Sequence, residues 1–296
     1  MIALNVLVLA LSAVSAIGSE LASRAPKRGC GTEISPAQKD AVEADFAARR
    51  TALPKKLTAA IVTIPTYYHV VRRGTTLSGG DVPDSQITAQ MAALNAAFAN
   101  TSYTFELVNT TRTTNTNWFQ RASLYSDGLS NQNAMKAALR RGDAGTLNLY
   151  SVGFTSGSAA SNGLLGYATF PSSYEDAPQD DGVVFLYSTV PGGSTASFNL
   201  GGTVQHEVGH WAGLYHTFNE GDLQGTCNGS SDEVDDTPAQ RSPTSGCPAR
   251  ADTCPSLPGD DPIHNYMDYS TDVCYTNFTP GQVARISAQM GVYRGI

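Results

Sequence analysis

The alternation of apolar and polar residues divides the chain into short strands and helices. Runs rich in β-branched and aromatic residues predict strands at residues 59–71, 103–108, 146–154 and 181–190, and a shorter strand within residues 163–170. Apolar residues at helical spacing predict a helix over residues 84–99, capped by Asp84 or Ser85. Residues 111–146 are irregular apart from a helix near residues 131–142. Strands that alternate with helices indicate a layered sheet with helices on its faces.

Helix signals also lie near both ends of the chain. Ser35 is an N-cap for a helix over residues 35–52, and the next residue is a proline at the first helical position. Thr279 and Gln282 form a capping box at the start of a helix over residues 279–290. These signals predict helices that flank the sheet region on both sides.

The stretch from residue 217 to 278 differs from the rest of the chain in composition and periodicity. It is rich in Asp, Gly, Ser, Pro and Cys and shows little periodicity, so it needs disulfides or bound ions to hold it in a compact domain. Four of the five cysteines lie in it: Cys227, Cys247, Cys254 and Cys274. Four cysteines allow three connectivities, and their spacing does not choose among them.

The N-terminus predicts export from the cell. Residues 2–13 are apolar, and residues 14–16 form a small-residue cleavage pattern, so residues 1–16 are expected to be a signal peptide, with a buried helix as the alternative. Residues 17–57 are polar and contain pairs of basic residues. We expect a removable pro-segment there, with an ordinary helical extension as the alternative.

Charge and composition limit the partners. The formal net charge is −7, and no run of Lys and Arg offers a face for phosphates, so nucleic acid and anionic membranes are not expected as partners. We expect a secreted, soluble monomer. Four sequons are candidate glycosylation sites: Asn100, Asn109, Asn228 and Asn277.

The stretch "HEVGHWAGLYH", residues 206–216, holds three of the five histidines. Residues four apart lie on one face of a helix, so His206 and His210 can direct ring nitrogens at one zinc ion. Glu207 is turned about 100° around the helix axis and can reach a water on that ion. A bare HExxH also arises by chance, but the five positions that include Gly213 and His216 are far more specific.

Gly213 explains the third histidine. A helix that continued to residue 216 would carry His216 away from the metal, whereas glycine ends helices with a positive φ and allows a sharp turn. Three histidine ligands leave the fourth position of a single zinc ion open, as in catalytic sites. The sequence therefore predicts one zinc ion per chain, held by His206, His210 and His216.

These residues resemble the long zinc motif HExxHxxGxxH of the metzincin metalloproteases. "HNYMDYS" supplies a candidate methionine turn at Met267, whose alternative role is core packing. "DDTPAQ" and "NYMDYSTDVC" make the chain similar to the pappalysin family, in particular the secreted fungal extracellular metalloproteinases. The resemblance implies an α+β metzincin-like catalytic domain over residues 58–296. Its upper subdomain, residues 58–213, would hold a twisted, mostly parallel sheet with helices. Its lower subdomain, residues 214–296, would be irregular, stapled by disulfides and closed by a helix.

The resemblance also implies an activity and its residues. Glu207 would act as general base and acid in zinc-dependent hydrolysis of proteins and peptides, and Tyr269 would stabilise the oxyanion, with a core aromatic as the alternative. The implied disulfides are Cys227–Cys254 and Cys247–Cys274. A substrate would lie between the subdomains and could pair with the strand within residues 163–170. A non-catalytic zinc-binding protein and a zinc hydrolase of non-peptide substrates are the rival functions.

Two further sites follow from the same resemblance. Cys30, in "RGCGTE", would place its thiolate on zinc and keep the enzyme latent, or else it is a free or mixed-disulfide cysteine in a mobile tail. Glu220, Asp232 and Thr237 offer oxygen ligands for calcium, or else they belong to a solvated acidic loop. His69, in a predicted strand, is expected to bond to the backbone rather than to a metal.

Overall fold

The computed structural model describes residues 28–52, 61–221, 225–227 and 231–296. The expected signal peptide, residues 1–16, and the sequon at Asn228 lie outside these ranges. The core element is a five-stranded sheet in the order β2-β1-β3-β5-β4. Its strands are β1 (Val62–Arg72), β2 (Tyr103–Thr114), β3 (Leu147–Val152), β4 (Gly166–Ala168) and β5 (Val183–Leu186). All pairs are parallel except the antiparallel edge strand β4, so the expected mostly parallel sheet is confirmed.

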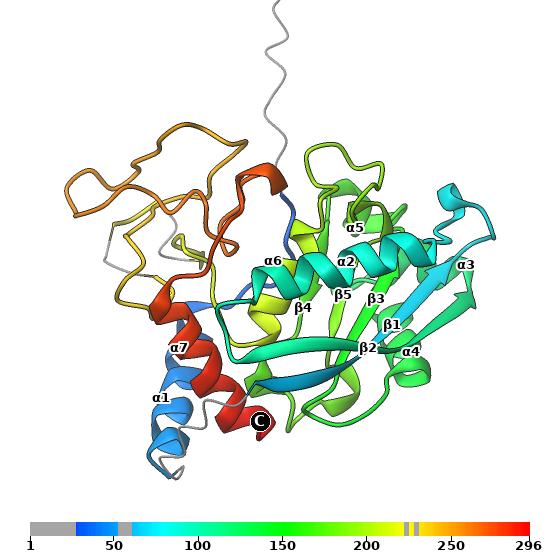
Figure 1. The fold of residues 1–296 in the computed structure, drawn as a ribbon, viewed down its shortest axis with the longest axis horizontal. Helices are drawn as coiled ribbons and strands as arrows, with labels where there is room; N and C mark the ends of the chain where they lie inside the picture. The colour runs from blue at the N-terminus through cyan, green and yellow to red at the C-terminus, as the bar shows by residue number, and fades with distance from the viewer. Residues whose placement is uncertain (1–27, 53–60, 222–224, 228–230) are drawn as a thin grey trace, which may run out of the picture.

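Helices cover both faces of the sheet (Figure 1). One face packs on α2 (Asp84–Ala97) and α6 (Gly202–Trp211), and the other on α3 (Thr116–Arg121) and α4 (Leu129–Leu139). The remaining helices are α5 (Gly157–Ser161), α1 (Pro36–Ala52), α7 (Pro280–Gln289) and a π-helix over Met290–Arg294. Short 3₁₀ turns lie at Leu77–Gly79, Pro171–Ser173, Pro178–Asp180, Tyr187–Thr189 and Asp272–Cys274.

The sequence of β3 shows why the sheet is buried on both sides. Leu147 and Leu149 pack in the cluster beneath α2 and α6, whereas Tyr150 and Val152 pack in the cluster beneath α3 and α4. A strand covered on both faces reads as a nearly continuous buried run, as is usual in parallel sheets.

The helix caps expected from the sequence are present in α1 and α7 but not in α2. Ser35 and Gln38 exchange hydrogen bonds at the start of α1, and Thr279 and Gln282 form the expected capping box of α7. The expected cap of α2 is wrong, because the N-cap is Pro83 and no side chain caps that helix. The region expected to be mostly irregular begins within a strand, since β2 extends to Thr114 along its partner β1.

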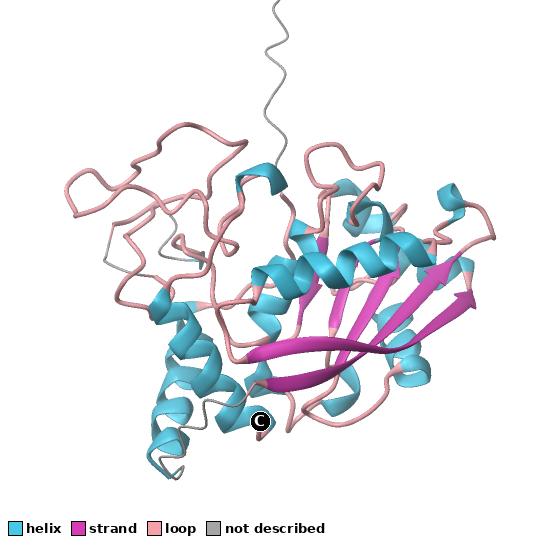
Figure 2. Ribbon diagram, viewed as in Figure 1, coloured by secondary structure: helices cyan, strands magenta, loops and turns pink. Residues whose placement is uncertain are grey.

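Residues 217–221, 225–227 and 231–278 form the irregular part of the described structure, drawn mostly as loop in Figure 2. Cys227–Cys254 and Cys247–Cys274 are disulfides, each closing 27 residues. On the chain-entropy model each contributes ~3 kcal/mol. Among the described residues, no helix is long and apolar enough to cross a bilayer.

His69 supports the fold rather than a metal. Its ring bonds to the side chains of Thr111 and Asn148, at 2.8 and 3.1 Å, and stacks on Tyr150; the expected bond to backbone is wrong. Burial lowers the pKa of His69 from 6.5 to about 4.

Acid is therefore expected to destabilise the fold through His69. The unfolded ring takes up a proton near pH 6.5 and the folded ring only near pH 4, so the free energy of unfolding falls as pH drops through this window. The contribution lost is roughly 3 kcal/mol. Chemical denaturation of the wild type and of His69→Gln, measured from pH 7 to 4, checks it. The stability difference should change by that amount, and parallel pH profiles would show that His69 does not carry it.

Candidate active site

The zinc motif lies on α6, which is buried along its whole length beside the edge strand β4. The helix ends at Trp211, and the chain then turns at Gly213, whose φ is +100°. A Cβ on Gly213 would lie 2.6 Å from Cβ of Gln289. Both the positive φ and the lack of space require glycine, and the turn directs His216 back toward α6.

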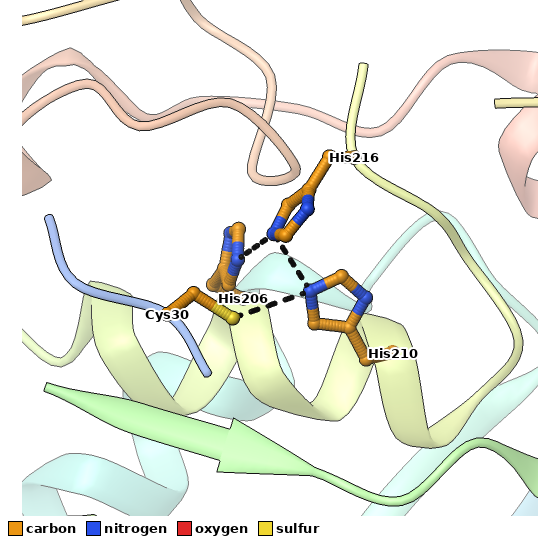
Figure 3. Close-up of side chains that lie close together, drawn as sticks. All are labelled: Cys30, His206, His210 and His216. Carbon is orange, nitrogen blue, oxygen red and sulfur yellow. Dashed lines mark hydrogen bonds between the residues drawn. The ribbon is translucent and has the colours of Figure 1, made fainter. Parts of the chain in front are cut away.

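Three imidazoles converge at the end of this turn (Figure 3). Nδ1 of His206 donates to the Tyr266 carbonyl at 2.6 Å, and Nδ1 of His210 donates to the Leu214 carbonyl at 2.8 Å. Nδ1 of His216 faces the Glu220 carboxylate. Since these oxygens accept hydrogen bonds from Nδ1–H, each neutral ring keeps a lone pair on Nε2. Burial lowers the pKa of His206 and His210 well below its ordinary value, which keeps these rings neutral.

The arrangement of lone pairs fits a zinc ion. Nε2 of His216 lies 3.1 Å from Nε2 of His206 and 3.0 Å from Nε2 of His210. Three acceptor nitrogens that face one another repel unless a cation lies between them. Tetrahedral nitrogen ligands of zinc lie roughly 3.3 Å apart, given bonds of about 2.0–2.1 Å. The residues present therefore match the donor set and the spacing of a zinc centre.

Cys30 occupies the fourth side of this group. Its Sγ lies 3.6 Å from Nε2 of His210, and the four candidate ligand atoms are all within 4.8 Å of one another. The segment around Cys30 runs parallel to β4, with Gly31 N donating to the Gly166 carbonyl at 2.9 Å. The edge strand expected to receive a substrate is thus covered by residues of the candidate pro-segment.

Glu207 lies beside the position that Cys30 occupies. Its Oε2 is 3.5 Å from Sγ of Cys30 and accepts a hydrogen bond from the Thr32 hydroxyl at 3.2 Å. Burial raises the pKa of Glu207 to about 7. A group that replaced the thiol would lie within reach of this carboxylate.

The methionine turn packs beneath the zinc helix. A Cβ on Gly209 would lie 2.4 Å from Sδ of Met267, so this approach also requires glycine. Asn265 supports the turn, since its Oδ1 accepts from Met267 N at 2.9 Å. The ring of Tyr269 lies 5.7 Å from that of His206 and 4.9 Å from that of His216, between centroids. Tyr269 also lines a cavity of about 560 Å³ between the candidate pro-segment and the loops after α6.

Sequence reasoning missed a buried pocket next to the zinc site. Arg28 is 3% exposed, and its Nη2 lies 2.6 Å from Oδ1 of Asp272. The guanidinium lies between the rings of Phe198 and Tyr275, at 4.9 and 4.7 Å from their centroids. Nη1 donates to the Thr203 hydroxyl at 3.0 Å. No local signal marks this pocket, because its residues lie up to 244 positions apart along the chain.

Glu220, one of the expected calcium ligands, faces a histidine of the candidate zinc site. Glu220 directs a carboxylate oxygen at His216, four residues before it, and so orients a candidate zinc ligand. Asp232 and Thr237 are buried, and Oδ1 of Asp232 accepts from Val234 N at 3.2 Å. Calcium binding stays a prediction.

The fold and the site together define a zinc metalloendopeptidase of the metzincin type. The family model for pregnancy-associated plasma protein-A, the M43 peptidases, matches residues 145–291. An extracellular metalloprotease of Colletotrichum graminicola is 48% identical over 239 residues, 80% of this chain and 79% of that relative. One of Pyricularia oryzae is 44% identical over 289 residues, 97% of this chain and 95% of that relative. The chain therefore belongs to the pappalysin family.

Solved structures agree with this assignment. A promirolysin variant of Tannerella forsythia matches with a TM-score of 0.72 at 26% identity, covering 90% of this chain and 95% of that one. Mature mirolysin of the same organism, in complex with a cleaved peptide, matches with a TM-score of 0.61 at 29% identity, covering 79% and 95%. The expected family, metzincin-like fold and enzyme class are confirmed.

Proposed function

We propose that the protein is a secreted zinc endopeptidase in which Glu207 is the general base and acid. One observation carries this role: Oε2 of Glu207 lies 3.5 Å from the atom that closes the fourth side of the histidine group. A water in place of that thiol would be within hydrogen-bonding reach of the carboxylate.

His206, His210 and His216 would hold the zinc ion. When bound, zinc supplies Lewis-acid chemistry, polarising a carbonyl and lowering the pKa of water. Glu207 accepts the proton of the attacking water and donates it to the leaving amine. Tyr269, beside two of the three imidazoles, stabilises the oxyanion that forms on the scissile carbonyl. Met267 packs beneath the zinc helix, and Gly213 provides the turn that brings His216 back toward it. Both residues therefore hold the histidines in place.

The pocket around Asp272 supports a preference for basic side chains beside the scissile bond. In the described structure this pocket already holds an arginine, with a buried carboxylate at 2.6 Å and two aromatic rings stacked on the guanidinium. Removal of Arg28 with the pro-segment would leave Asp272 without its cation. A substrate Arg or Lys replaces that charge, whereas an apolar side chain leaves it uncompensated.

The same contacts support a latent zymogen over residues 17–57, followed by the catalytic domain. Cys30 blocks the fourth side of the zinc site while Arg28 fills the adjacent pocket. A thiolate is a good zinc ligand, so its displacement by water would start activity.

Replacing Cys30 by Ala is expected to abolish this block. The unprocessed chain should then mature at least ~10-fold faster than the wild type, because no thiolate competes with water for the fourth zinc position. Gel analysis of freshly purified protein at several times measures the rate. Asp40→Asn, at an exposed position of α1, is the control and should mature normally. An unchanged rate in Cys30→Ala would remove the thiol from the latency mechanism.

Further proposals concern the setting of the enzyme. The names of the relatives support secretion, with residues 1–16 as the signal peptide, and the turn after α6 supports a subdomain boundary at residue 213. Three sequon asparagines, Asn100, Asn109 and Asn277, are exposed and accessible to glycosylation. We expect one zinc ion per monomer and neither nucleic acid nor membrane as partner.

Cleavage of casein by the processed protein tests the function. Activity that a chelator abolishes and zinc restores is expected. Zinc binding without cleavage of any protein or peptide would favour the non-catalytic alternative, and hydrolysis of non-peptide substrates alone would favour the other rival.

A further inference from the structure

The helix α1 attaches the candidate pro-segment at a second place, away from the histidines. In Figure 1, α1 lies alongside α7 at one end of the molecule. Glu43 of α1 pairs with Arg285 of α7, Nη1 to Oε2 at 3.1 Å, and accepts from the Tyr215 hydroxyl at 2.9 Å. Phe46 stacks on Tyr293, with 6.1 Å between ring centroids. This surface is distinct from the pocket that holds Arg28.

Charges alternate along the contact. Lys39 lies 3.0 Å from Glu233, and Arg49 lies 2.9 Å from Glu175. On the helix the contacting positions are 39, 43, 46 and 49, which follow the i, i+4, i+7, i+10 spacing of a single helix face. We define the α1-binding face as the residues that receive them: Glu175, Tyr215, Glu233, Arg285 and Tyr293. It recognises a cation, an acid, an aromatic ring and a cation in that order.

The face adjoins the zinc site. Nε of Arg285 donates to the Gly213 carbonyl at 3.0 Å, and Tyr215 precedes the ligand His216. Only a few residues separate Thr32, which contacts Glu207, from the first turn of α1. One polypeptide can therefore occupy the cleft and this face at once.

Loss of α1 would leave the α1-binding face without its partners. The side chain of Arg285 is 6% exposed, and among the described residues Glu43 is the one carboxylate in ion-pair contact with it. Without Glu43, the guanidinium keeps the Gly213 carbonyl and the Tyr215 ring. The ring of Tyr293 loses Phe46. The vacated surface carries two acidic side chains, one arginine and two tyrosine rings, which an amphipathic helix with basic, acidic and aromatic residues at the spacing of α1 would match.

We propose that in the mature enzyme the α1-binding face is an exosite for amphipathic helical segments of protein substrates. Such a segment carries a basic residue, an acidic residue four positions later and an aromatic residue three positions after that. The proposal rests on the proposed function, because the face is free only after the pro-segment has been cut and released.

Two substrates of the processed protein, freed of its pro-segment, test it. One is a short fluorogenic reporter with a basic residue, which occupies the cleft alone. The other is the same reporter joined by a flexible linker of about ten Gly and Ser residues to residues 36–52 of this chain. A tether raises the effective concentration to the millimolar range, so the fusion should have a KM at least ~10-fold lower at the same kcat.

Matched substitutions in the fused helix distinguish specific recognition from nonspecific binding. Glu43→Gln or Phe46→Ala within the fused helix should raise KM to that of the reporter, whereas Asp40→Asn should not. In the enzyme, Tyr293→Ala should raise KM for the fusion alone. Equal KM values for all fusions, or a free 36–52 peptide that inhibits reporter and fusion equally, would overturn the proposal. Failure to cleave the plain reporter would instead count against the proposed function.

Discussion

Replacing Glu207 by Gln is expected to lower kcat/KM for peptide cleavage by at least ~10²–10⁴-fold while bound zinc stays unchanged. Gln has nearly the same shape, but it cannot take a proton from water. In the proposed zinc centre the three imidazoles would contact the metal through Nε2, and none of their Nδ1 partners is Glu207. This variant should therefore lose catalysis but keep its bound zinc.

The measurement needs both proteins in the same mature form. The variant cannot process itself, so both are processed by the same added protease and freed from it before zinc and kcat/KM are determined. Glu106→Gln, an exposed change on β2, is the matched control and should behave as the wild type. Normal turnover in Glu207→Gln would show that another group moves the proton, and loss of zinc would show that Glu207 supports the ligands.

Replacing Asp272 by Asn is expected to lower kcat/KM for peptides with Arg at the specificity position by ~10²–10³-fold. Truncating one partner of a buried charge pair costs about 2–5 kcal/mol. The backbone N–H groups of Leu200 and Gly202, which donate to Oδ2 at 2.8 and 3.1 Å, can still bond to the amide oxygen, so the local fold should survive. Peptides with Leu at that position should be cleaved no more slowly than by the wild type.

Steady-state kinetics with two peptides that differ only at this residue measures the change. Asp260→Asn, which removes an exposed carboxylate paired with Arg250, serves as the control. Mass spectrometry of the products then assigns the residue to one side of the cleaved bond. An equal loss for both peptides would mean that Asp272 supports the fold of the site, and no loss for either would place the specificity pocket elsewhere.

The features that were predicted correctly from the sequence depend on residues that lie close together along the chain. Histidines four residues apart on one helix, followed by a glycine turn, leave few arrangements other than a common centre, and the structure brings His206, His210 and His216 together. Ser35 and Thr279 are caps because their side chains bond within three residues. The cap of α2 failed because Pro83 already sets an extended conformation before the helix.

Contacts that are distant along the chain could not be predicted in this way. The bond between Arg28 and Asp272 joins residues that no periodicity relates, and the pair between Glu43 and Arg285 brings two separate helices together. Glu220 illustrates a subtler case. Its carboxylate, an expected calcium ligand, lies against His216 after the turn at Gly213, a contact that the sequence did not predict. Sequence gives the type of side chain, and packing decides which neighbour it meets.

Metal analysis of the processed protein tests the central claim most directly. Purified without chelators, the wild type is expected to contain close to one zinc ion per chain. His216→Ala should retain far less, because it removes the ligand that the turn at Gly213 brings to the site. Zinc near zero in the wild type, or an unchanged content in His216→Ala, would contradict a centre built from these three histidines.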